Sequence, residues 1–118
     1  MDIQSVLLQY DKMFGNTPLE QIEAFLDNKI AEAVKESDDS AIITLLNEMI
    51  GLCRDTSQKE KALAYAAQLK SLLDRMGLGG TESYATSMQN IANAYRAFGR
   101  WEEAEKAFEL IKETYDVY

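Results

Sequence analysis

Hydrophobic and polar residues follow a helical period along almost the whole chain. Apolar residues recur at steps of three and four, and no segment alternates strictly as a half-buried β-strand would. Glycines and short polar clusters interrupt the pattern at regular distances. It therefore predicts about six helices with short loops, near residues 2–14, 18–36, 39–55, 58–76, 81–98 and 101–118.

Polar residues at the interruptions predict how several helices begin and end. The segments TPLE, from Thr17, and SQKE, from Ser57, match the capping box in which a hydroxyl and a glutamate satisfy free backbone N–H groups. Thr81 or Ser83 is placed to cap the fifth helix. Gly99 is expected to end that helix in a left-handed backbone conformation.

The second half of the chain repeats at an interval of 42 residues. The repeat places Ser57 on Gly99, Ala62 on Ala104 and Leu69 on Ile111, and Gly15 lies the same distance before Ser57. Such repeats indicate stacked units of one supersecondary structure. We expect one domain, 1–118, made of antiparallel helix pairs at about 2–36, 39–76 and 81–118.

Aromatic and small residues alternate around the last predicted turn, in NAYRAFGRWEEAEKAF from Asn93. Small residues such as Ala104 suit close approach of two helices. We interpret Tyr95, Trp101 and Phe108 as core side chains that fill the joint, rather than as a cage for a ligand.

At these residues the chain resembles the tetratricopeptide repeat family. The stretch YATSMQNIANAYRAFGRWEEAEKAF, Tyr84 to Phe108, is similar to the 42-residue variety found in kinesin light chains. The second unit departs from the family pattern at Gly51 and Lys59. The resemblance implies an all-α, right-handed superhelical array of about three helix pairs, an α-α solenoid. Its concave face would hold an extended peptide or a partner helix.

A polar stripe on the fifth predicted helix is the best candidate for binding. Asparagine and glutamine both donate and accept hydrogen bonds, so they suit contact with a peptide backbone of any sequence, and in the family asparagines placed like Asn90 and Asn93 do this. Solvated helix-face residues remain the alternative interpretation. The candidate peptide-binding residues are Asn47, Arg54, Thr86, Gln89, Asn90, Asn93 and Arg96.

The sequence offers few residues that could carry out catalysis. The chain has no histidine, the commonest general base and metal ligand. Its one cysteine, Cys53, lies on an apolar stripe and is interpreted as a buried structural thiol. No metal-site spacing is present. We expect no enzyme activity, no catalytic residue, no metal and no cofactor.

Charge and hydropathy narrow the class of partner. The 20 acidic and 12 basic residues give a net charge of −8, which opposes binding to nucleic-acid phosphates. The longest apolar runs are too short to cross a bilayer, and the N-terminus lacks a secretory pattern. We expect a cytoplasmic protein whose partner is a protein or peptide, with no nucleic acid and no membrane.

The last predicted helix carries an apolar face formed by Phe108, Ile111, Tyr115 and Tyr118, with no polar capping helix after it. Repeat arrays need such a cap to stay soluble. The sequence therefore predicts a non-catalytic protein-interaction scaffold. The alternative is a structural oligomerisation module that forms a homodimer through this face.

Overall fold

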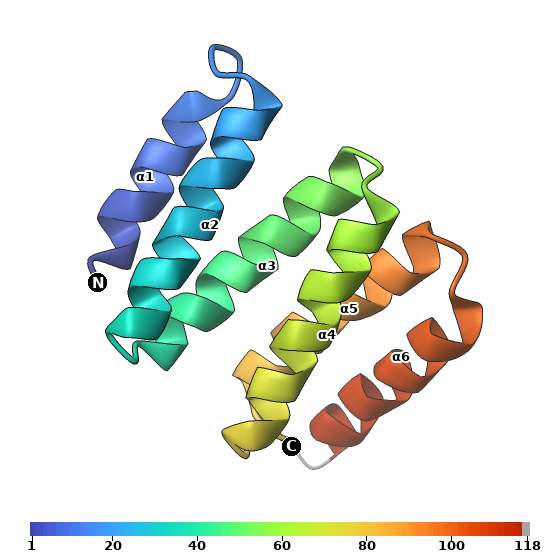
Figure 1. The fold of residues 1–118 in the computed structure, drawn as a ribbon. Helices are drawn as coiled ribbons and strands as arrows, with labels where there is room; N and C mark the ends of the chain where they lie inside the picture. The colour runs from blue at the N-terminus through green and yellow to red at the C-terminus, as the bar shows by residue number, and fades with distance from the viewer. Residues whose placement is uncertain (117–118) are drawn as a thin grey trace. The chain divides into compact units, whose positions relative to one another are not determined.

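The protein is all-helical over residues 1–116, the part that the computed structural model describes; side chains are described through Thr114. The predicted fold class is thereby confirmed at the level of helices, with no strand in the described range (Figure 1). Each helix end within this range lies within about a residue of its predicted position. The helices are α1 Ile3–Met13, α2 Leu19–Lys35, α3 Asp39–Asp55, α4 Lys59–Arg75, α5 Glu82–Ala97 and α6 Trp101–Asp116.

The helices form two compact units, Met1–Leu45 and Leu46–Tyr118. In the first unit, α1 packs against α2. The core side chains of these two helices recur at steps of three and four, as an amphipathic helix requires. They are Val6 and Tyr10 on α1, and Ile22, Leu26, Ile30 and Ala33 on α2.

The second unit contains the later part of α3 together with α4, α5 and α6, and in it α5 packs against both α4 and α6. Small buried side chains allow these helices to approach closely, as expected for Ala104. Larger apolar side chains such as Met49 and Ile91 fill the rest of the core, and Cys53 is fully buried, as predicted. The buried alanines are Ala62, Ala66, Ala85, Ala92, Ala94, Ala104 and Ala107.

The left-handed turn predicted at Gly99 is present, with φ of +76°. The N–H of Gly99 donates to Arg96 O at 3.2 Å and that of Arg100 donates to Tyr95 O at 2.8 Å, which satisfies two carbonyls at the end of α5. Ser57 adopts the same conformation, with φ of +58°. The 42-residue interval therefore holds for the backbone at the turn.

Two of the three predicted helix caps are wrong. Thr81 does cap α5, since its hydroxyl accepts from Tyr84 N–H at 3.2 Å. Thr17, however, donates its hydroxyl to Asn16 Oδ1, and α2 begins after Pro18 without a side-chain cap. Ser57 cannot cap α4 because it still terminates α3, and α4 follows Gln58 without a side-chain cap.

Trp101 is not a core residue, contrary to the interpretation of the joint. It is 64% exposed and Phe108 is 36% exposed, while Tyr95 is half-buried. The reason is helical phase. At about 100° per residue, Trp101 and Phe108 point roughly 100–120° away from Ala107, which lies on the buried face of α6.

Candidate functional site

Two of the predicted binding residues join α3 to α5 within the unit Leu46–Tyr118. The side-chain amide of Asn90 donates to the backbone oxygen of Asn47 at 3.0 Å and to its side-chain oxygen at 3.1 Å. Both residues are half-buried. Because one group on α5 binds both the backbone and the side chain of Asn47, it restrains the position of one helix along the other.

Arg54 and Ser87 extend this contact. Arg54, near the end of α3, donates from Nη1 to Asn90 Oδ1 at 3.2 Å and from Nε to Asp55 at 3.3 Å. Asn47 donates to the hydroxyl of Ser87, which is almost fully buried, at 3.0 Å. We call Asn47, Arg54, Ser87 and Asn90 the α3–α5 network.

Ser87 is not among the binding residues predicted from the sequence. It lies one helical turn before Asn90 and therefore faces the same side of α5. A serine three residues before a candidate asparagine was the available signal. The predicted polar stripe runs through Thr86 and Gln89 and leaves Ser87 out.

The other four predicted binding residues lie on the outer side of α5. Thr86 and Gln89 are exposed, and Asn93 is half-buried. Asn93 accepts from Arg96 Nη2 at 3.1 Å within the same helix. The guanidinium of Arg96 also lies 5.9 Å from the ring centroid of Phe108 on α6. We call Thr86, Gln89, Asn93 and Arg96 the α5 polar face.

The seven predicted residues thus separate by contact. Asn90 bonds to both Asn47 and Arg54 across two helices, whereas Thr86 and Gln89 are exposed and Asn93 bonds within α5. The matched pair Arg54 and Arg96 differs in the same way. Arg54 bonds to Asn90 on another helix, whereas the guanidinium of Arg96 lies beside the ring of Phe108.

The described part of the chain contains no candidate metal site. Its aspartate and glutamate residues and Cys53 do not gather in any group of three or more that would hold a metal ion. Among the helices it describes, none has the length and apolar character needed to cross a membrane. Comparison with protein-family models, with curated proteins and with solved structures found no match.

Proposed function

We propose that this chain is a non-catalytic protein-interaction module of the tetratricopeptide-like type, with its helix pairs arranged as a right-handed superhelix. The module binds an extended peptide of a partner protein along the α5 polar face. The α3–α5 network has a separate task, which is to hold α5 in place. The net charge of −8 favours a protein partner over a nucleic acid.

The observation that carries this proposal is the spacing of two amide groups on the outer side of α5. Gln89 and Asn93 are four residues apart on a helix, which corresponds to about 6 Å along its axis. An extended peptide advances about 6.6 Å for every two residues. A peptide lying along α5 would therefore present a peptide group to each amide in turn.

The side-chain chemistry supports the same mode of binding. An amide side chain both donates and accepts, so it pairs with a peptide N–H or C=O without selecting a side chain. Arg96 adds a positive charge at one end of the face, where it would favour an acidic residue or a C-terminal carboxylate. Its contact with Phe108 limits the conformations that it must give up on binding.

A peptide-display selection on the immobilised chain tests the proposal. We expect a random peptide library to yield binders whose affinity falls by about tenfold or more for the double variant Gln89→Ala/Asn93→Ala, because two hydrogen-bonded groups are lost. The matched control is Gln68→Ala, which removes an exposed amide from α4. Circular dichroism verifies that both variants remain folded.

Either variant can refute the assignment of the binding site to the α5 polar face. Binders that retain their affinity for Gln89→Ala/Asn93→Ala, or that lose it equally for Gln68→Ala, would exclude the α5 polar face. A library that yields no binder at all would argue against peptide capture by this chain.

The second candidate function is self-association through α6. It is favoured by the exposure of Trp101 and Phe108, which lie seven residues apart and share one side of that helix. Tyr115 and Tyr118, predicted as part of this apolar face, lie outside the residues whose side chains are described. Light scattering over a range of concentrations should show a dimer that Trp101→Ser abolishes. A monomer at every concentration would refute this function.

A further inference from the structure

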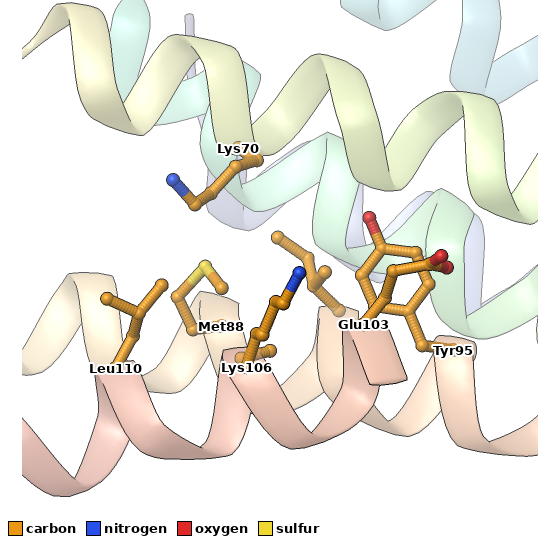
Figure 2. Close-up of a pocket in the computed structure, with 8 residues that line it drawn as sticks. Lys70, Met88, Tyr95, Glu103, Lys106 and Leu110 are labelled. Carbon is orange, nitrogen blue, oxygen red and sulfur yellow. The ribbon is translucent and has the colours of Figure 1, made fainter. Parts of the chain in front are cut away.

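A cavity of about 180 Å³ lies between α4, α5 and α6, inside the unit Leu46–Tyr118 (Figure 2). Its floor is apolar and consists of Ile91, which is fully buried, and Met88, which is almost so. Leu110 lines one side. The residues that line it on α5 lie on the side of that helix opposite the α5 polar face. The cavity is thus a separate feature from the proposed peptide-binding face.

Hydrogen-bond donors dominate the polar part of the cavity wall. Figure 2 shows Lys106 reaching into the cavity from α6, Lys70 above it on α4, and Tyr95 on α5 with its hydroxyl pointing towards α4. Lys106 is exposed and forms no ion pair with any described residue. A positively charged group with no partner therefore stands beside an apolar surface in a protein of net charge −8.

The other charged side chains at the cavity each bond to a neighbouring residue. Glu103, the one carboxylate in the wall, accepts from Arg100 Nε at 2.7 Å and from its Nη2 at 3.3 Å. Lys70 donates to Asp74 at 2.6 Å. Burial lowers the pKa of Lys70, but the bond to Asp74 and the proximity of Tyr84 together raise that pKa above its ordinary value. Lys70 therefore stays charged at neutral pH.

The size of the cavity sets the size of its occupant. A cavity of about 150 Å³ accommodates a benzene-sized group, and drug-sized ligands need about 300 Å³ or more. A single bulky side chain fits, whereas a long acyl chain would leave most of its surface in water. An anionic group beside that side chain would meet Lys106 at the rim.

We infer that this cavity binds a peptide segment of a partner protein in which a bulky aliphatic side chain lies next to a carboxylate. The side chain packs against Leu110 and Tyr95, above Met88 and Ile91, and the carboxylate pairs with Lys106. Neither contact involves the α5 polar face, so this site is independent of the function proposed above.

Methyl NMR on the intact chain tests the site, because Met88 provides a reporter inside it. Protein labelled at the methionine methyl groups is titrated with the blocked tetrapeptide acetyl-Gly-Leu-Glu-Gly-amide. We expect the Met88 signal to shift saturably and the signal of Met49, buried in the core on α3, to stay unchanged. The matched peptides replace Glu with Gln or Leu with Ala.

Each part of the proposed contact has its own expected loss. Replacing Glu with Gln should weaken binding about fivefold, as for an exposed ion pair, and replacing Leu with Ala about tenfold. The variant Lys106→Gln should lower affinity for the Glu peptide to that for the Gln peptide. Lys112→Gln, which removes an exposed lysine of α6 outside the cavity, should have no effect.

Three outcomes would overturn the inference. They are an unshifted Met88 signal, equal affinity for the Glu and Gln peptides, and saturation by octanoate without saturation by the peptide. The last would assign the cavity to a small aliphatic acid. Unchanged peptide binding by Gln89→Ala/Asn93→Ala would separate this site from the α5 polar face.

Discussion

Replacing Asn90 with alanine tests whether an amide joins α3 to α5 or merely faces solvent. The change removes two donated bonds to Asn47, which share one amide group and count as about one, and one bond accepted from Arg54. At about 1 kcal/mol for each net bond, the loss is about 2 kcal/mol. The better helix propensity of alanine returns about 0.5 kcal/mol. We expect the free energy of unfolding to fall by about 1.5 kcal/mol.

Asn93→Ala is the matched control, since it changes the same residue type three positions later on the same helix. Asn93 accepts only from Arg96 within α5 among the described contacts, so its replacement should alter the free energy of unfolding by no more than about 0.5 kcal/mol. Urea unfolding followed by circular dichroism measures both values, and the Asn90→Ala midpoint should fall by about 1 M. Equal midpoints for the two variants would contradict the bridging role.

Three further outcomes are expected. Ser57→Gly should raise the free energy of unfolding by about 0.5–1 kcal/mol, because a left-handed φ strains serine but not glycine. The strain relieved exceeds the conformational entropy that glycine adds to the unfolded chain. An unchanged urea midpoint would refute this. The pKa of Asp38 lies below its ordinary value of 3.8, because its carboxylate accepts bonds from the Ala41 N–H and the Met1 amino group. The contribution of Asp38 to stability is therefore present above about pH 4 and is lost as the pH falls through the folded-state pKa. Asp38→Asn should therefore lower the melting temperature at pH 6 and less so towards pH 2, whereas a constant difference would argue against the bonds. The sole tryptophan, Trp101, should fluoresce like free indole in water and be quenched readily by acrylamide, unless it is covered by a second molecule.

The helices could be predicted from the sequence because each depends on a local pattern. Periodic apolar residues define the buried face, and a residue with positive φ ends the helix. The starts were predicted less well. A capping box needs its hydroxyl residue to be free for the helix that follows, and Ser57 is still held by the end of the preceding one.

The candidate site was predictable only in part. Helical spacing correctly placed Gln89 and Asn93 on one side of α5, because that property belongs to a single helix. The bonds among Asn47, Arg54 and Asn90 depend on how two helices meet, which no local pattern encodes. The exposure of Trp101 has a similar origin. Its neighbours in sequence are suited to a core, but its angle around α6 is set by where Ala107 packs.

The 42-residue interval itself has a simple physical origin in the helix lengths. Residues with positive φ end five successive helices, at Gly15, Ser37, Ser57, Gly77 and Gly99. Each interval between neighbours in this series is one helix of 16 or 17 residues plus its turn. Two successive intervals span one helix pair, which gives 42 residues from Gly15 to Ser57 and from Ser57 to Gly99, and 40 from Ser37 to Gly77. The turns therefore repeat even where the side chains do not, as at Ser57 and Gly99. The turns of a chain of helix pairs can thus recur along the backbone while the side-chain contacts differ from one pair to the next. The α3–α5 network and the contacts around the cavity beside Lys106 are examples. Arg54 and Arg96 occupy matching places in the repeat, yet Arg54 bonds to Asn90 on another helix and Arg96 to Asn93 on its own, so the repeat alone does not predict the contacts of a residue.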